Sequence, residues 1–427
     1  SGLKLPTTSP SPEIPAYRGD DRTAPNLKSI SHSAHGKLAY HFGEKNTIRL
    51  MGYFSGIERG GEFSSWSQLS NGLDAAGHTR GTTIALFKTM TGLDFDSQIT
   101  DDLSLKFRIS YLQGKPGSKD RIDTGNDIFY IKRDFGYQAL ETSLESAWNI
   151  IKDLTAVVGA EFIYDWENLP SSLSVLRSSN DEVAAGEIQE ISSTRQDSLD
   201  LYNLGAFAQL SWSGLKPYIY LTSGLRYDYH SIYGNKVSGR AGLTSNPHKI
   251  LFLKVLYGSA FKAPSPLLLY GTPYETGDIV GNPELKPQIV HTVEGQITLK
   301  PWSFFSASTG LAYNSLKDKA EFVQRGINRF ADNMSKMQGI SWESEIAAEY
   351  KEHLAGKISF ELQNTKREFD TRQSTYLSYL VGNRNVIYPS YIMRADLSGR
   401  LPKLPLRIGA SLMLAGDRPS SEMNSIE

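Results

Sequence analysis

The sequence predicts an all-β fold, a transmembrane antiparallel up-and-down β-barrel, and three observations support this prediction. Apolar and polar residues alternate: in 103–111 the odd positions are apolar and the even positions are polar. Many alternating segments run for about ten residues or more, the length of a tilted membrane strand and longer than the mean soluble strand of roughly 5–6 residues. Aromatic residues stand at the ends of the apolar faces, as in the interfacial girdles of membrane barrels.

Each expected strand is placed by its own alternation, and taken in order the segments give about sixteen strands. Segments 137–150, 218–230, 340–350 and 354–363 carry their charged residues mainly on one face and their apolar residues mainly on the other. The strand centres lie near residues 37, 51, 89, 107, 143, 159, 207, 223, 240, 255, 294, 309, 343, 359, 396 and 410.

Short and long connections alternate between these strands. The short ones are 43–46, 100–102, 151–153, 214–217, 246–249, 300–302, 351–353 and 401–405, and the long ones lie near 60–80, 113–135, 167–200, 231–236, 270–287, 324–334 and 368–389. Short turns at one end and longer loops at the other are typical of outer-membrane barrels, in which the short turns are periplasmic.

Composition narrows the function classes. The chain has 427 residues and a formal net charge of −1, so no basic excess indicates a nucleic-acid partner. It has no cysteine, which excludes disulfides and thiolate metal sites. No apolar run approaches the ~20 residues that a membrane helix needs. The sequence begins Ser1-Gly2 without a signal-peptide pattern, and we expect it to be a fragment of a longer chain.

One segment, 257–294, suggests a family. An alternating strand runs into Phe261-Lys262-Ala263-Pro264-Ser265, a loop follows, and Gly281-Asn282-Pro283-Glu284-Leu285-Lys286-Pro287 precedes a second alternating strand that includes Glu294. Pro283 and Pro287 fix φ in this turn-rich stretch. The order and spacing of these motifs resemble those of TonB-dependent outer-membrane receptors, in which this element is a rising strand, a ligand-facing loop and a returning strand.

The resemblance implies a larger native architecture. Such receptors have an N-terminal plug inside a 22-stranded barrel, whereas we find about 16 strands, no plug and no energy-coupling box. We therefore expect residues 1–28 to be an extracellular loop or strand remnant, and 29–427 to be an internal section of the barrel without its plug and terminal strands. The alternative is that the sixteen strands close by themselves as a porin-sized barrel, because an open sheet edge in lipid is not viable.

The resemblance also implies an activity and a set of site residues. We expect an outer-membrane receptor that binds a scarce nutrient (an iron–siderophore, cobalamin or similar small molecule) at extracellular loops and imports it with TonB-coupled energy. Its partners would be outer-membrane lipid and lipopolysaccharide, a plug domain, a TonB-type periplasmic energy transducer and other outer-membrane proteins. The candidate ligand-binding residues, which could equally be packing residues of surface loops, are Phe63, Trp66, Tyr270, Tyr274, Glu275 and Asp278.

Charged residues on the polar strand faces are the candidates for lining the lumen. In the family such charges face water and hold the plug by reversible polar contacts, whereas without a plug they are simply a wetted wall. A charge on the lipid face would cost about 2–4 kcal/mol at the midplane, so the two faces should not be reversed. The residues are Arg108, Glu141, Glu145, Arg226, Asp228, Glu343, Glu345 and Lys357.

Other features support no site. The long 167–200 loop is acidic, but it has no Asp-x-Asp-x-Asp-Gly spacing for calcium, and we take it to be a solvated loop. His32 and His35 would point to opposite faces of a strand and make a poor chelate. There is no Gly-x-Ser-x-Gly, Walker or His-Glu-x-x-His motif. We expect no enzyme, metal or cofactor, and the runner-up function is a passive porin or a structural barrel of a larger outer-membrane assembly.

Overall fold

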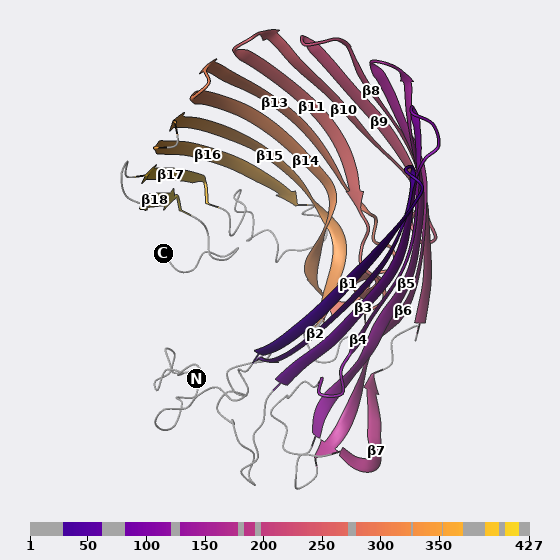
Figure 1. The fold of residues 1–427 in the computed structure, drawn as a ribbon. Helices are drawn as coiled ribbons and strands as arrows, with labels where there is room; N and C mark the ends of the chain where they lie inside the picture. Colours follow the sequence, from indigo (N-terminus) through magenta and orange to yellow (C-terminus); the bar gives the residue numbers. More distant parts are fainter. Residues whose placement is uncertain are drawn as a thin grey trace.

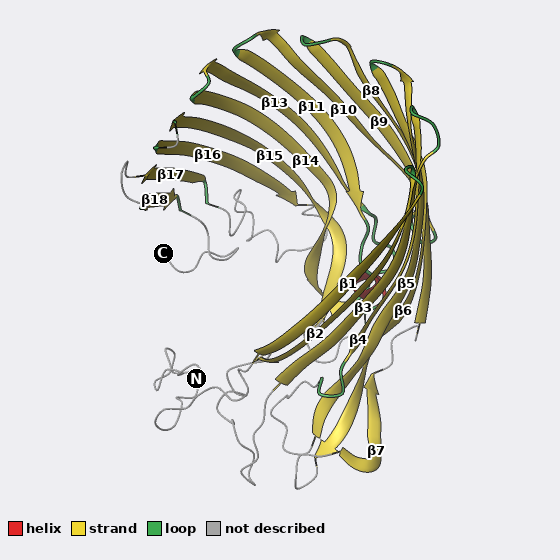
Figure 2. Ribbon diagram, in the orientation of Figure 1, coloured by secondary structure: helices red, strands yellow, loops and turns green. Residues whose placement is uncertain are grey.

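A computed structural model of the chain describes residues 29–61, 82–120, 129–177, 183–192, 198–271, 279–325, 328–351, 353–369, 389–400 and 406–417. These residues form one strongly curved sheet of long antiparallel strands (Figure 1). Strand accounts for nearly all of the described structure, with one short helix (Figure 2). No helix among the described residues is long and apolar enough to cross a membrane.

The strands follow one another around the sheet in chain order. Their bounds are β1 (Ser29–Phe42), β2 (Asn46–Gly61), β3 (Thr82–Gln98), β4 (Leu103–Pro116), β5 (Phe129–Ile151), β6 (Leu154–Arg177), β7 (Val183–Ser192), β8 (Ser198–Leu215), β9 (Ile219–His230), β10 (Gly234–His248), β11 (Leu251–Lys262), β12 (Ile279–Val280), β13 (Gln288–Trp302), β14 (Phe305–Arg325), β15 (Asn328–Tyr350), β16 (Leu354–Phe369), β17 (Tyr391–Arg400) and β18 (Arg407–Ala415), and the helix is α2 (Pro266–Tyr270).

The predicted up-and-down sheet is confirmed. All sixteen expected centres fall within strands, and consecutive strands pair antiparallel except around β7 and β12. β6 pairs with β8 as well as with the short β7, and β11 pairs directly with β13. Within the described residues β1 pairs with β2 and β18 with β17, so these two strands form the edges of the sheet and lie apart in Figure 1.

The short turns are tight where the sequence supplies suitable residues. Gly43 takes a φ of +65°, in the left-handed region where glycine has no steric cost, and it joins β1 to β2. At the other end of the sheet, the 231–236 connection was expected to be one of the long ones, but the structure shows only the 231–233 turn between β9 and β10, and Gly234 begins β10 with a φ of +66°. The turns therefore fix the register in which each strand returns along its neighbour.

The two faces of the sheet differ in chemistry. One face carries large apolar side chains that remain exposed, such as Leu38 (69% exposed), Leu225 (61%) and Leu311 (60%). The other face carries most of the charged residues, and some of them are buried: Asp228 is only 2% exposed. A single-layer sheet with a broad exposed apolar face needs an apolar environment to cover that face, as a membrane would.

Among the described residues, one small cluster of buried apolar side chains packs together near the ends of the long strands. Leu269 of α2, Leu285 and Ala331 of β15 are buried together, and Ile232, Leu268, Tyr270 and Ala320 pack against them. The helix also contacts β6, although β8, β9 and β10 separate β6 from β11 in the sheet. The segment after β11 therefore crosses the concave side of the sheet, where Figure 2 shows the helix within the curve.

Candidate functional site

The charged face is continuous around the sheet, because paired residues share a face. Arg108 lies opposite Ser143, which pairs with Glu161, then Gly205, then Asp228. The same register continues through β10, β11, β13 and β14 to Glu343 of β15. By alternation along each strand, this one face holds all eight residues that the sequence suggested for the lumen: Arg108, Glu141, Glu145, Arg226, Asp228, Glu343, Glu345 and Lys357.

The charged face is the concave one. Leu199 and Leu201 of β8 lie on it, opposite Glu167 and Asp165 of β6, and they are only 6% and 5% exposed. A residue on a single-layer sheet becomes this buried only when other parts of the chain cover it. The α2 segment crosses the concave side to reach β6, so it lies where it can cover Leu199 and Leu201. The apolar side chains with high exposure therefore face outward.

Arg226 is the centre of a buried charge group on the concave face. Its Nη2 lies 2.7 Å from Glu161 and 2.8 Å from Asp228, and its Nε lies 2.9 Å from the second oxygen of Asp228. Asn203 also donates to Asp228, at 3.2 Å. The buried Asp228 carboxylate therefore has both a charge partner and hydrogen-bond donors, as a buried charge requires.

Further ion pairs neutralise the wall formed by β2 to β5. Arg108 donates to Asp94 at 2.7 Å, and Lys106 lies 3.7 Å from Glu145. Arg49 pairs with Asp96. Glu141 accepts a hydrogen bond from Ser110 at 3.3 Å. On this part of the concave face, acidic and basic side chains thus satisfy one another.

The wall formed by β13 to β17 is different. Lys357 pairs with Glu345 at 2.6 Å, but Glu343 lies directly opposite Glu361. Among the described residues, neither Glu343, Glu361 nor the nearby Glu294 has an ion-pair partner. These groups line a hollow of about 800 Å³ that Lys254 and Arg394 also border. In this sector the carboxylates of Glu294, Glu343 and Glu361 can therefore make polar contacts with a partner on the concave face.

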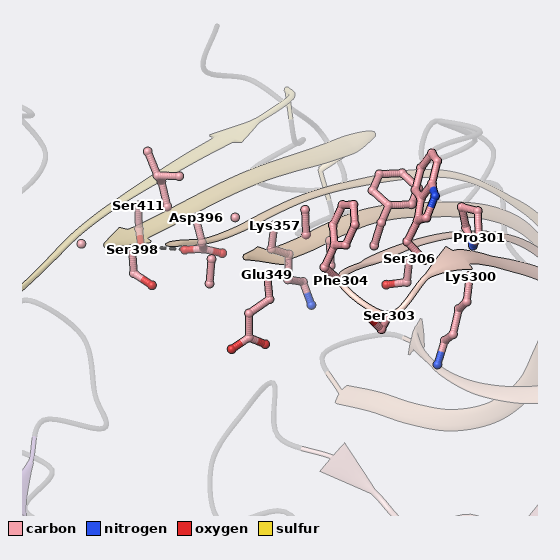
Figure 3. Close-up of a pocket in the computed structure, with 18 of the residues that line it drawn as sticks. Lys300, Pro301, Ser303, Phe304, Ser306, Glu349, Lys357, Asp396, Ser398 and Ser411 are labelled. Atoms are coloured by element: carbon pink, nitrogen blue, oxygen red, sulfur yellow. Dashed lines mark hydrogen bonds between the residues drawn. The ribbon is translucent and has the colours of Figure 1, made fainter. Parts of the chain in front are cut away.

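A second hollow, of about 690 Å³, lies toward the short-turn end of the same strands. Lys300, Glu349, Lys357 and Asp396 bring charges to it, while Phe304 brings an aromatic ring (Figure 3). Ser411 of β18 donates to Asp396 of β17 at 2.6 Å, which is the dashed contact in Figure 3. The hollow has the mixed polar and aromatic lining of a water-exposed wall, and no cluster of metal ligands occurs among the described residues.

Only one of the six suggested ligand-binding residues lies in a described part of the chain. Phe63, Trp66, Tyr274, Glu275 and Asp278 lie outside the described residues. Tyr270 is the last residue of α2 and packs against the buried Leu269–Leu285–Ala331 cluster. The structure therefore gives Tyr270 a packing contact, and the grouping of the six residues stays a prediction.

The Gly281–Pro287 stretch fastens the α2 segment to the β14–β15 hairpin. The Asn282 amide donates to the Ala331 carbonyl at 2.9 Å, and the Asn282 backbone donates to Leu268 at 2.8 Å. Asn333 accepts from the Lys286 backbone at 2.7 Å, and its own amide donates to the carbonyls of Lys286 at 3.0 Å and Asp318 at 2.6 Å. The motif that suggested the family is thus an anchor for the segment before it.

Gly281 has a specific steric role in this anchor. A Cβ at this position would lie 2.6 Å from the backbone nitrogens of Gly271 and Tyr270 and 2.7 Å from the Leu269 carbonyl carbon. No side chain fits there without a backbone shift. The turn chemistry read from the sequence therefore has a second cause, which is the close approach of α2.

Sequence reasoning missed several residues of the site. Glu161 and Asp94 are ion-pair partners of Arg226 and Arg108, and Asn333 holds the anchor, yet none was singled out. Glu161 could have been found because it has the parity of the polar face, although the apolar residues around it on β6 weaken that signal. Asn333 gives no signal in sequence, because its role depends on the packing of β15 against the distant Gly281–Pro287 stretch.

The family follows from a comparison with known sequences. A family model described as "TonB dependent receptor-like, beta-barrel" matches residues 24–400. The chain belongs to this family. The membership confirms the resemblance drawn from 257–294, and members of this TonB-dependent receptor-like family are bacterial outer-membrane receptors and transporters rather than enzymes. No curated protein matches the sequence.

Solved structures share the fold at low sequence identity. The siderophore receptor PirA from Acinetobacter baumannii is 15% identical with a TM-score of 0.67, and the match covers 90% of this chain and 58% of that one. The ferric enterobactin receptor from Pseudomonas aeruginosa is 16% identical with a TM-score of 0.68, and the match covers 93% of this chain and 59% of that one. The FrpB iron transporter from Neisseria meningitidis is 15% identical with a TM-score of 0.64, and the match covers 93% of this chain and 60% of that one. The chain thus spans less than two thirds of the length of these structures.

Proposed function

We propose that this chain is the barrel part of an outer-membrane active-transport receptor. In this proposal the receptor binds a scarce nutrient, such as an iron–siderophore, cobalamin or similar small molecule, at its extracellular loops. It imports the nutrient with energy that a TonB-type periplasmic transducer delivers through a plug domain. The observation that supports this best is the chemistry of the sheet: its concave face is charged, and its convex face is exposed and apolar.

The charged concave face supports a water-filled or plugged lumen in this proposal. Ion pairs on β2 to β9 keep that wall polar, and they neutralise the buried carboxylates of Asp94 and Asp228. The sector from β13 to β17 keeps Glu294, Glu343 and Glu361 available for polar contacts with a plug. Such contacts are weak and reversible when water can replace them, which suits a plug that has to move.

The anchored α2 segment supports the assignment of the two ends. It lies at the end of the sheet where the longer connections are, which is the extracellular end of outer-membrane barrels. The Gly281–Pro287 anchor holds it on the concave side, so it would narrow the mouth of the lumen from outside. A ligand descending from the extracellular loops would meet this segment.

The sheet edges support a longer native barrel. β1 and β18 each pair on one side among the described residues, and unpaired backbone groups are not viable in lipid. We propose that residues 29–427 are an internal section of a barrel of about 22 strands, the number in plugged outer-membrane transporters. The chain's 58–60% coverage of the matched structures agrees with that proposal.

Uptake by cells tests the proposal. The native full-length gene would be deleted and restored, and accumulation of radiolabelled iron–siderophores, cobalamin and copper would be measured with and without the TonB-type transducer. The proposal predicts that one ligand class accumulates only when both genes are present. Uptake that persists without the transducer, together with steady conductance of the purified full-length protein in bilayers, would instead establish a passive porin. Absence of both would favour a structural barrel.

A further inference from the structure

A hollow of about 400 Å³ lies at the long-loop end of β4, β5 and β6, away from the concave face. From β6 it takes Trp166 and Asn168 but not the intervening Glu167, which lies on the charged face opposite Leu199. Successive residues of a strand point to opposite faces, and the register places Gln113, Gln138 and Trp166 together on the face opposite to the charged one. The hollow therefore opens on the outer, convex face. Its polar lining includes Gln113, Lys115, Lys132 and Gln138.

The hollow is basic. Among the described residues, neither Lys115 nor Lys132 has an ion-pair partner. Lys119, close to Lys115 in the chain, is already neutralised by Glu58 at 3.0 Å. The nearest carboxylates of β6, Asp165 and Glu167, point to the other face of the sheet. Two lysines therefore share a recess whose other polar side chains, which include the amides of Gln113, Gln138 and Asn168 and the hydroxyl of Ser118, are uncharged.

Aromatic residues around the hollow indicate its level in the membrane. The Tyr111 hydroxyl donates to the Gln138 side chain at 2.6 Å. The rings of Tyr164 and Trp166 meet edge to face at 4.4 Å, and Trp166 remains 40% exposed on the convex face. Tyr and Trp on the outer face of a membrane barrel mark the level of the lipid headgroups. Below this level, the exposed Leu144 and Val158 continue the apolar face.

We propose that this hollow binds the phosphate group of a phosphorylated glycolipid in the outer leaflet of the membrane. Lysine binds phosphate as a point charge, and side-chain amides donate additional hydrogen bonds to its oxygens. Trp166 lies where it can pack against the sugar or the upper part of an acyl chain. The recess faces the lipid and not the lumen, so its ligand is a lipid headgroup and not the transported nutrient. This inference rests on the proposed outer-membrane location.

Binding of lipid A to the native full-length protein tests the inference. The protein would be placed in nanodiscs of zwitterionic phospholipid, and binding of fluorescent bisphosphorylated lipid A would be compared with that of the dephosphorylated lipid. The double variant Lys115→Gln/Lys132→Gln should bind the bisphosphorylated lipid at least about tenfold more weakly than wild type, because each charge contributes on the order of 1 kcal/mol near a membrane surface. Wild type should prefer the bisphosphorylated lipid, and the double variant should lose that preference.

Lys88→Gln is the matched control. Lys88 pairs with Gly114, beside Lys115, but points to the concave face, so its loss should leave lipid binding unchanged. Equal binding of bisphosphorylated lipid A by wild type and the double variant would overturn the inference. So would inorganic phosphate that competes as strongly as the lipid, because the site would then recognise free phosphate.

The experiment separates this inference from the proposed function. Fractionation of cells and heat-modifiable migration of the protein in gels report whether it inserts into the outer membrane. A protein that does not insert contradicts the proposed function and, with it, this site. A protein that inserts normally but binds lipid A independently of Lys115 and Lys132 contradicts only the lipid site.

Discussion

Arg226 binds both carboxylate oxygens of Asp228, the residue two positions further along β9: Nη2 lies 2.8 Å from Oδ1, and Nε lies 2.9 Å from Oδ2. The Asp228 side chain is 3% exposed and the Arg226 side chain 31%. Replacing Arg226 with Met leaves the Asp228 charge buried without its partner. We expect the free energy of unfolding to fall by about 3 kcal/mol, at the lower end of the range for an uncompensated buried charge because the arginine is partly solvated.

Urea titration of the refolded full-length protein in detergent, followed by tryptophan fluorescence, measures this loss. The double variant Arg226→Met/Asp228→Asn should recover part of the lost stability, because it removes both charges. Asp101→Asn is the control: its pair with Lys45 spans 3.2 Å, but the two side chains are 95% and 52% exposed. Equal effects of Arg226→Met and Asp101→Asn would show that the Arg226 group is solvated and unimportant.

Gly281→Ala should loosen the anchor of the α2 segment. The new methyl group would lie 2.6–2.7 Å from backbone atoms of residues 269–271, so the turn or the helix has to shift. Hydrogen–deuterium exchange should become faster in 263–287 and stay unchanged in β1 to β4. Gly258→Ala is the matched control, because nothing lies within 4 Å of a Cβ there. Unchanged exchange in 263–287 would mean that the anchor does not depend on this close approach.

Asn333 gives a second test of the anchor that separates its donors from its acceptor. The variant Asn333→Asp keeps the oxygen that accepts from the Lys286 backbone but loses the donors to the Lys286 and Asp318 carbonyls. Asn333→Ala loses all three contacts. In the alanine variant the Lys286 amide loses its acceptor, and local stability should fall by about 1–3 kcal/mol. In the aspartate variant this acceptor remains while the second oxygen faces the two carbonyls, so the Lys286 amide should stay more protected than in the alanine variant. Exchange of the Lys286 amide measures both, and identical rates in the two variants would contradict the assigned hydrogen bond.

A charge on the convex face should be far more costly than one on the concave face. Leu225 is 61% exposed and apolar-facing, whereas Thr222 lies three residues earlier on β9 and has the parity of Arg226. The variant Leu225→Arg should make folding into lipid vesicles less favourable by about 2–4 kcal/mol if this position lies near the bilayer midplane. Arginine at Thr222 should cost much less. Folding titrations in vesicles compare the two, and a larger cost at Thr222 would reverse the assignment of the faces.

The regular part of the fold was predictable because each long strand records its two environments in alternate residues. Segments such as 218–230 need no tertiary information to be recognised, and β9 lies where the alternation places it. β7 and β12 were not predicted. β12 has only two residues and pairs parallel with β15, so its existence depends on the loop anchor and not on any pattern of its own.

For the candidate site, the sequence likewise predicts the face on which each residue lies but not its partner. Alternation is enough to put Arg108, Arg226 and Glu343 on one face. It does not tell which residue faces Arg226 across the sheet, since that depends on the register of neighbouring strands. The pairing of Glu161 with Arg226 therefore became visible only when β6, β8 and β9 were aligned. The role of Asn333 was not predictable, because it joins segments that meet only in the folded chain.

Site-directed spin labelling along β9 tests the central claim, that the charged face is inside and the apolar face meets lipid. The native 427 residues contain no cysteine, so single cysteines from 219 to 230 can be introduced one at a time into the full-length protein and labelled in native-like bilayers, after any cysteines elsewhere in the full-length chain are replaced. The structure predicts a period of two: labels at Leu221, Leu225 and Tyr227 should be accessible to oxygen in the lipid, and labels at Thr222, Gly224 and Arg226 should not. Uniform accessibility, or the opposite phase, would contradict the account.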